Sequence, residues 1–142
     1  MTRGFRRLAI VSTLAVGAFT AACGNDAATT PSTPSVTRTT ETFSGTVQVG
    51  GSDFHSFRVS ATGPTDVTLT SAGPPATIVM GLALGTASDA GCSRLAGASV
   101  NTAAGSTPQL AGLTSAGSLC VQVRDVGNQN APVTYSVSVA HP

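Results

Sequence analysis

The sequence predicts an all-β domain, an antiparallel, jelly-roll-like β-sandwich of about seven or eight strands. Beyond residue 42, apolar and polar residues alternate with a period of two, which is typical of strands with one buried face. Clusters of turn-forming residues interrupt this alternation about every 8–12 residues. No window keeps the period of about 3.6 residues that marks an amphipathic helix.

Three alternating segments open the domain, and each ends at residues typical of turns. The expected strands are residues 43–49, 54–60 and 66–71, which end at Gly50 to Asp53, Gly63-Pro64 and Pro74-Pro75. In the second of these strands, Phe57 lies on the apolar face with His55 and Val59. Phe54 lies on the opposite face among Ser and Arg side chains, so we expect it to be exposed.

The second half of the domain begins and ends with clear strands. Residues 78–84 are apolar on both faces, so we expect this strand to be the most buried. Residues 85–116 are rich in small side chains, and we expect one or two short strands near 94–100 and 109–113. The chain closes with strands at 119–123 and 133–139, of which the second places Tyr135 in the core.

The N-terminal segment has the pattern of an export signal, which we assign to residues 1–22. Three Arg within the first seven residues precede an apolar run at 8–19. That run is too short to span a bilayer, which takes about 20 residues. Ala21-Ala22-Cys23 resembles the lipobox of bacterial lipoproteins. The resemblance implies that Cys23 receives a thioether-linked diacylglycerol and becomes the mature N-terminus. The alternative is an ordinary secretory signal that happens to end near a cysteine.

A lipidated Cys23 makes the membrane the first expected partner and places the protein in the cell envelope. Gly24 stands where an Asp would favour inner-membrane retention, so we expect the outer membrane, with the domain in the periplasm or on the cell surface. Residues 23–41 are rich in Thr, Ser and Pro and predict a flexible linker. We therefore expect the folded domain to occupy residues 42–140.

The charge balance argues against a nucleic-acid partner. The chain has seven Arg, no Lys and six acidic residues. Removal of residues 1–22 leaves four Arg against six acids, a net charge of −2, and the remaining Arg are scattered. Nucleic-acid binding needs clustered cations. The sequence indicates no cofactor.

Two cysteines fall within the expected domain, Cys92 and Cys120. An even number of cysteines in an exported domain predicts a disulfide. Cys120 alternates out of phase with Leu119 and Val121, so we expect the bridge to cross the outer face or to pin the long loop. The sequence contains no Cys-x-x-Cys pair, and we therefore assign the bridge a structural role.

Short motifs of one order recur along residues 42–140: Gly45-Thr46, Gly51 to Val59, Val67-Thr68-Leu69, Ala116 to Val123 and Tyr135 to Val139. Together they resemble the bacterial pre-peptidase C-terminal domain. The resemblance implies a β-sandwich and no activity. His55 stands where the family has a second Asp and Leu119 where it has a Tyr, and these departures weaken the carry-over of a calcium site. The run from Cys120 to Asn128 and the final His141-Pro142 are similar to small lipoproteins of environmental bacteria.

Two clusters are candidates for cation binding. Asp53 and His55 are both metal-ligating residue types, but two ligands are too few for a site. The alternative is that Asp53 caps the turn and His55 holds a hydrogen-bonded ring at the strand end. Asp125 to Asn128 follows a strand, where Asp, Gly and Asn together indicate a turn. A calcium loop there would need further carboxylates such as Asp66 and Asp89.

No motif for nucleophilic catalysis is present, so we expect no catalytic residues and no enzyme activity. The sequence favours a binding or envelope-structural protein, with Phe54, Arg58, Asp125 and Asn128 as candidate contact residues. The first alternative, which the resemblance to the pre-peptidase domain implies, is a weak carbohydrate- or protein-binding accessory domain. The second is a metal-dependent enzyme that uses Asp53 and His55.

Overall fold

The computed structural model describes residues 36–142, which form eight β-strands. The strands are β1 (Thr39–Val47), β2 (Ser52–Val59), β3 (Gly63–Gly73), β4 (Met80–Ser88), β5 (Gly91–Thr102), β6 (Leu110–Thr114), β7 (Gly117–Arg124) and β8 (Val133–His141). In this part of the chain, no helix is long and apolar enough to cross a membrane. The predicted signal peptide, Cys23 and most of the predicted linker lie outside the described residues.

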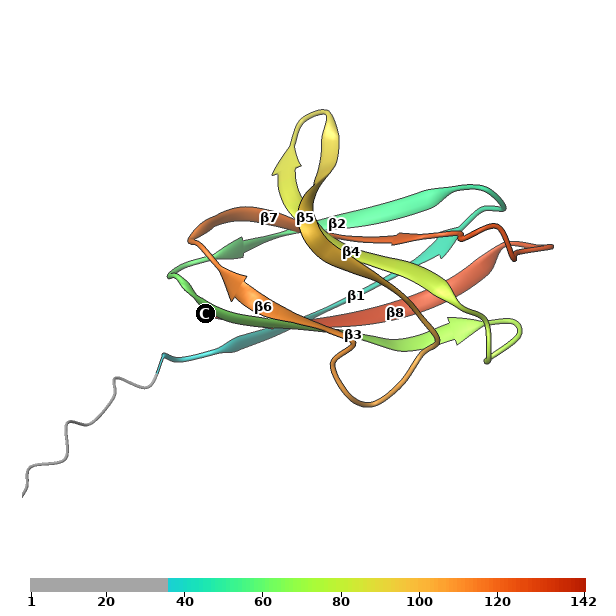
Figure 1. Cartoon of the computed structure of the whole chain (residues 1–142), viewed down its shortest axis with the longest axis horizontal. Helices are drawn as coiled ribbons and strands as arrows, with labels where there is room; N and C mark the ends of the chain where they lie inside the picture. Colours follow the sequence, from blue (N-terminus) through green and yellow to red (C-terminus); the bar gives the residue numbers. More distant parts are fainter. Residues whose placement is uncertain (1–35) are drawn as a thin grey trace, which may run out of the picture. The chain divides into compact units, whose positions relative to one another are not determined.

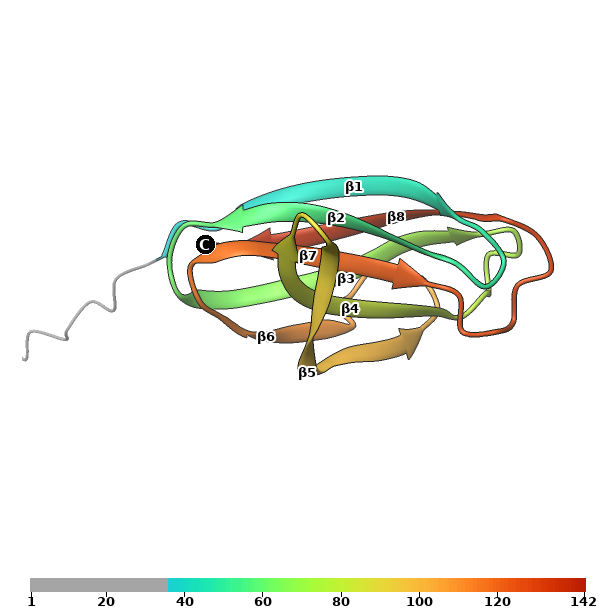
Figure 2. The same ribbon diagram turned by 90° about the horizontal axis from the view of Figure 1, so that it is seen from above.

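The strands form two four-stranded antiparallel sheets that pack face to face (Figure 1). Their orders are β1-β8-β3-β6 and β2-β7-β4-β5, seen face on in Figure 2. Every connection except β4–β5 crosses from one sheet to the other. This order is that of a jelly roll, so the predicted all-β, jelly-roll-like sandwich is confirmed.

The core lies between the sheets and is built from alternate residues of the strands. Phe57 and Tyr135, which the alternation placed in the core, are 5% and 3% exposed. The remaining large members are aliphatic side chains and one methionine: Val47, Val59, Val67, Leu69, Ile78, Met80, Leu82, Leu84, Leu119, Val121, Val123, Val133, Val137 and Val139. The period of two therefore identified the inward face of most strands.

Two boundaries predicted in the N-terminal half, the start of the domain and the start of its third strand, are wrong. The domain begins at β1, before residue 42, because β8 pairs with β1 back to Thr39 and Arg38 donates to Asp66 at 2.7 Å. Gly63 and Pro64 do not form a break between strands; they are the first two residues of β3. Strand β8 pairs with β3 only from Asp66 onward, so Pro64 lies where β3 has a neighbour on one side only. A sheet tolerates proline at such a position.

Strand β4 is buried from Met80 to Gly85, as its apolar sequence predicted. The outward-facing residues of β4 are small, and residues of the neighbouring strands cover them. A Cβ at Gly81 would lie 2.7 Å from Cγ of Arg124, and a Cβ at Gly85 would lie 2.8 Å from Sγ of Cys92. Small residues on the outer face therefore let a side chain and a hairpin lie directly on the sheet.

The small-residue stretch forms β5, which is longer than expected, and β6. Ala83 of β4 pairs with Ser99, whereas Gly85 pairs with Arg94, so four residues of β5 bulge opposite Leu84. Beyond this bulge the β4–β5 hairpin projects from the sandwich (Figure 1). The predicted disulfide joins Cys92 in this hairpin to Cys120 of β7, with an S–S distance of 2.03 Å. It pins the hairpin over the outer face of the sheet.

Candidate functional site

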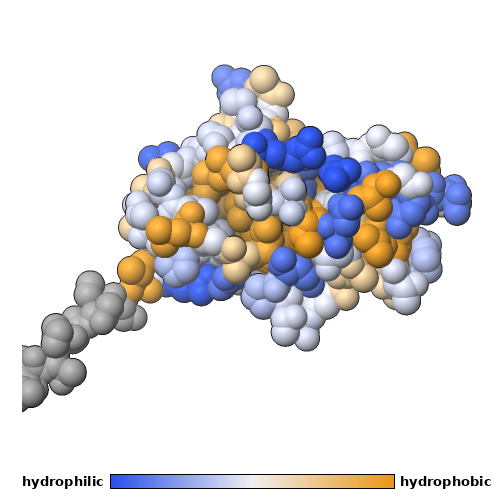
Figure 3. All heavy atoms as spheres, in the orientation of Figure 1, coloured by the Kyte–Doolittle hydropathy of each residue, from blue (hydrophilic) through white to orange (hydrophobic). Residues whose placement is uncertain are grey.

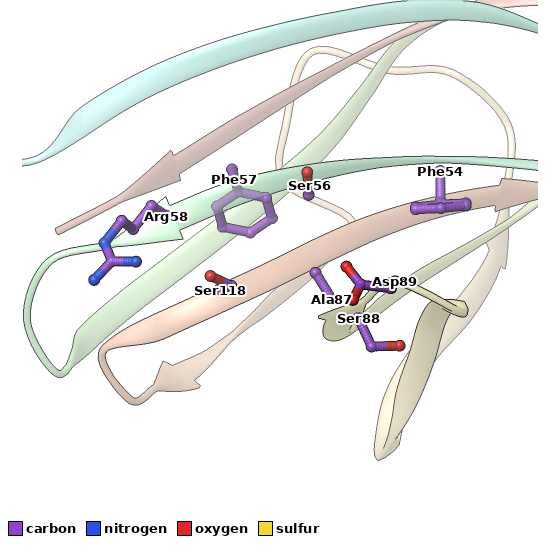
Figure 4. Close-up of a pocket in the computed structure, with 8 residues that line it drawn as sticks. All are labelled: Phe54, Ser56, Phe57, Arg58, Ala87, Ser88, Asp89 and Ser118. Carbon is purple, nitrogen blue, oxygen red and sulfur yellow. The ribbon is translucent and has the colours of Figure 1, made fainter.

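A hollow of about 470 Å³ lies on the outer face of the β2-β7-β4-β5 sheet, beside the pinned hairpin. The outward residues of β2 form its floor and the hairpin supplies a wall (Figure 4). Its lining residues are Phe54, Ser56, Phe57, Arg58, Ala87, Ser88, Asp89 and Ser118. We call this concavity the Phe54 hollow. The surface next to Phe54 is therefore concave, although it belongs to a sheet.

Phe54 is the main apolar group in this site. Its side chain is on the outer face as predicted, and the residue is 43% exposed. The hairpin comes close to the ring, since a Cβ at Gly91 would lie 3.8 Å from the ring edge. One edge of the ring thus lies beside the hairpin, and the residue remains 43% exposed.

Charged and hydroxyl groups line the rest of the hollow. Figure 4 shows Phe54 and Arg58 at opposite ends of the hollow, with Asp89 on the hairpin side. Ser56, Ser88 and Ser118 add hydroxyl groups that can donate and accept hydrogen bonds. The structure thus brings the two candidate contact residues of β2 into one site and adds Asp89, which the sequence suggested only as a calcium ligand.

No protein-family model and no curated protein matches this chain. The side chains of the Phe54 hollow therefore indicate its chemistry. An accessible aromatic face, hydroxyl groups and separated opposite charges are suited to a polar ligand with an apolar face. They provide no activated nucleophile.

The other two candidate contact residues, Asp125 and Asn128, form hydrogen bonds that stabilise a turn. The Asp125 carboxylate accepts hydrogen bonds from the backbone N–H groups of Gly50, Gly127 and Asn128, at 2.8, 2.8 and 3.1 Å. The Asn128 amide donates to the carbonyl of Val79 at 3.1 Å. Asp125 thus ties the β1–β2 turn to the loop after β7.

The carboxylates suggested as further calcium ligands lie elsewhere. Asp66 pairs with Arg38 on the other sheet, at 2.7 Å, and Asp89 lines the Phe54 hollow. Within residues 36–142, no group of three or more His, Cys, Asp or Glu side chains is placed to hold a metal ion. The Asp125 turn therefore gains no carboxylate from either residue.

Replacement of Asp125 by Asn should lower the melting temperature at neutral pH. The hydrogen bond from Gly50, followed by those from Gly127 and Asn128, holds the pKa of the Asp125 carboxyl below its ordinary value of 3.8. A lowered pKa means that the charged form stabilises the folded state above pH 3.8 and that this contribution is lost as the pH falls through the folded-state pKa. The melting-temperature difference between wild type and variant should therefore vanish in acid. A difference independent of pH between 2 and 7 contradicts this assignment.

Asp53 and His55 meet Tyr135 at the edge of the sandwich where β1 and β2 lie. The Tyr135 hydroxyl donates to the Asp53 carboxylate at 2.8 Å and lies 2.8 Å from Nε2 of His55. His55 also stacks on Phe43, with ring centroids 5.0 Å apart. The two predicted metal candidates are thus engaged in a hydrogen-bond network with a core tyrosine.

Gly45 makes room for this network. It lies opposite Tyr135 in the β1–β8 pairing, and a Cβ there would collide with the Asp53 carboxylate and lie 2.8 Å from the Tyr135 hydroxyl. The sequence pattern missed this arrangement, because Gly45 and Tyr135 are adjacent only after β1 and β8 pair.

A buried histidine was also missed. His141 is 3% exposed, and its Nε2 lies 2.9 Å from a Glu41 carboxylate oxygen. Its ring packs on Phe57 at a centroid distance of 5.1 Å. Glu41 and His141 lie in the first and last strands, so their contact joins these two strands.

The opposite edge of the sandwich carries an apolar groove between β5 and β6. Leu84, Leu95, Leu110 and Leu113 line it, and Leu113 is 78% exposed. Figure 3 shows apolar side chains gathered on the side of the molecule that this edge faces. This groove is separate from the Phe54 hollow and offers control positions for binding experiments.

Proposed function

We propose that this protein is a non-enzymatic, lipid-anchored binding module of the cell envelope whose ligand contacts the Phe54 hollow. The observation that supports the binding role is an accessible aromatic ring inside a concavity on an otherwise polar sheet face. The hairpin that forms one wall is tethered by a disulfide, so the site is preformed. A preformed site loses less conformational entropy on binding.

A carbohydrate is the ligand class that this lining favours. The face of an aromatic ring packs against the C–H groups of a sugar, and hydroxyl and charged side chains around it bind sugar hydroxyls. Phe54 provides the ring, and the serines of the hollow provide hydroxyl groups. The carbohydrate-binding alternative from the sequence is therefore the form of the proposal that we carry forward.

Replacement of Phe54 by Ala should weaken binding of a glycan by about tenfold, which corresponds to about 1.4 kcal/mol of lost stacking. A glycan array with the purified domain identifies binders, and titration calorimetry measures their affinity. Leu113→Ala removes a more exposed apolar side chain from the β5–β6 edge and is the matched control. Equal affinity of Phe54→Ala and wild type removes Phe54 from the site.

The anchor is tested on the full chain in cells. Metabolic labelling with a fatty acid should mark the wild-type protein and leave Cys23→Ala unlabelled. The variant should also leave the membrane fraction, because acyl chains supply the binding free energy at about 0.8 kcal/mol per buried CH₂. A Cys23→Ala protein that stays in the membrane fraction contradicts the lipoprotein assignment.

A further inference from the structure

A second hollow, also of about 470 Å³, lies on the same sheet face. We call it the arginine hollow, because Arg94 and Arg124 both line it. Its other lining residues are Gly50, Gly51, Ser52, Cys92, Gln122 and Asp125. Gln122 of this hollow is the cross-strand partner of Phe54, so the two hollows are neighbours.

The fold positions the guanidinium group of Arg124 and the backbone of Arg94. The stem of Arg124 lies across Gly81, and its guanidinium is 3.5 Å from both the Asn101 side-chain oxygen and the Asp125 carbonyl oxygen. Arg94 follows Cys92 by two residues, so the disulfide that pins the hairpin also restricts Arg94. Two cations from different strands thus meet at one polar concavity.

The distribution of charge on this face favours anions, because three Arg line the two hollows against two acidic residues, Asp89 and Asp125. Residues 36–142 contain four Arg, of which Arg38 pairs with Asp66 on the other sheet. The other three line the two hollows, and none of them forms an ion pair within these residues. Asp125 is the acidic residue of the arginine hollow, and its carboxylate is occupied by three backbone N–H groups.

The pairing register sets the order of these groups along β2. Arg124 lies opposite Ser52, and Phe54 and Arg58 follow along the same strand. A ligand that lies along β2 therefore meets a cationic end, an aromatic ring and a second cation. The span from Ser52 to Arg58 is about 20 Å, at about 3.3 Å per residue. This length suits an oligomer with repeated anionic groups.

We propose that this face binds an acidic polysaccharide, with a uronate carboxylate held by Arg94 and Arg124 and a neighbouring sugar stacked on Phe54. The inference rests on the proposed carbohydrate-binding function and adds the charge of the ligand. Arginine pairs with carboxylates through charge-assisted, often bidentate hydrogen bonds. In a linear polyuronate, carboxylates lie on both sides of the sugar that stacks on Phe54. Arg124 and Arg58 lie on both sides of Phe54 along β2, so the order of charges in such a ligand matches the order of groups in the site.

Calorimetry with oligogalacturonate, alginate and hyaluronan fragments tests the proposal. At least one should bind, and Arg94→Gln and Arg124→Gln should each weaken it about tenfold. Arg38→Gln, on the opposite sheet, is the matched control and should bind like wild type. Raising the salt concentration should weaken binding, because exposed charges are screened.

The proposal is overturned if none of these polymers binds, or if both arginine variants keep wild-type affinity. It is also overturned if methyl-esterified oligogalacturonate binds as tightly as the free acid, or if poly-glutamate binds with the same arginine dependence. The proposed function fails separately: it is lost if Phe54→Ala binds every glycan like wild type. A further outcome is that a neutral glycan binds in a way that depends on Phe54 and on neither Arg94 nor Arg124. That result supports the proposed carbohydrate-binding function and refutes the proposal of an anionic ligand.

Discussion

Removal of the Cys92–Cys120 disulfide is expected to lower the free energy of unfolding by about 3.6 kcal/mol, because the unfolded chain regains the entropy that closure of a loop of this length takes from it. The two cysteines are 28 positions apart in the sequence. For a domain of about 100 residues, such a loss lowers the melting temperature by roughly 15–25 °C. Thermal melts of the Cys92→Ala, Cys120→Ala double variant measure it.

Reduction of the wild-type protein with dithiothreitol is the control for the substitutions, because it opens the same loop without removing side-chain atoms. The reduced wild-type protein should have the same melting temperature as the double variant. It should also lose affinity at the Phe54 hollow, because Ala87, Ser88 and Asp89 belong to the hairpin that the bridge holds. An unchanged melting temperature after complete reduction refutes the structural role of the bridge.

Replacement of Tyr135 by Phe is expected to cost about 2 kcal/mol, because the change removes one hydroxyl and leaves two polar side chains without their partner. Tyr135 is 3% exposed, and its oxygen bonds both Asp53 and His55. The ring still fills the core, so packing is preserved. Chemical denaturation measures the loss, and Thr70→Val, which removes a surface hydroxyl bonded to Ser136 at 3.1 Å, is the control.

The same hydroxyl should make the fold sensitive to alkali. Burial, followed by the hydrogen bond and the charge of Asp53, raises the pKa of Tyr135 well above its ordinary value of 10.0. The neutral phenol therefore stabilises the folded state fully below pH 10, and this stability is lost as the pH rises toward the folded-state pKa. Stability of wild type should fall above pH 10, and that of Tyr135→Phe should fall less.

This titration is directly observable, because the chain has one Tyr and no Trp. Phenolate absorbance should appear together with the loss of β-sheet circular dichroism. A phenol that ionises near pH 10 in the still-folded protein contradicts the burial of Tyr135 and the hydrogen bond to Asp53.

The alternation of side chains was sufficient to predict the fold class and most of the core. It located β2, β7 and β8 within a few residues, because one face of each strand is buried and the other is polar. It missed the start of β1 and the place of Pro64 within β3. The polar residues Thr39 to Thr42 become a strand only because β8 supplies hydrogen bonds, and Pro64 is tolerated because β3 pairs there with β6 alone and has no neighbour on its β8 side.

The candidate site was predicted in part. Phe54 and Arg58 were identified as outward residues of one strand, and both line the same hollow. Arg94 and Arg124 were not singled out, since they are far apart in the sequence and neither belongs to a motif. Asp53 and His55 were paired correctly in space, but Tyr135, which joins them, comes from the other sheet.

By itself, the sequence determined the β-sandwich, the cysteine pairing and the outward position of Phe54, because these depend on side-chain periodicity and on how many cysteines the domain has. Only the tertiary structure decided that the β4–β5 hairpin rises over that face, that two hollows flank the bridge and that three arginines gather there. Such features depend on contacts between distant strands, and the pairing register that creates them is a property of the whole sheet.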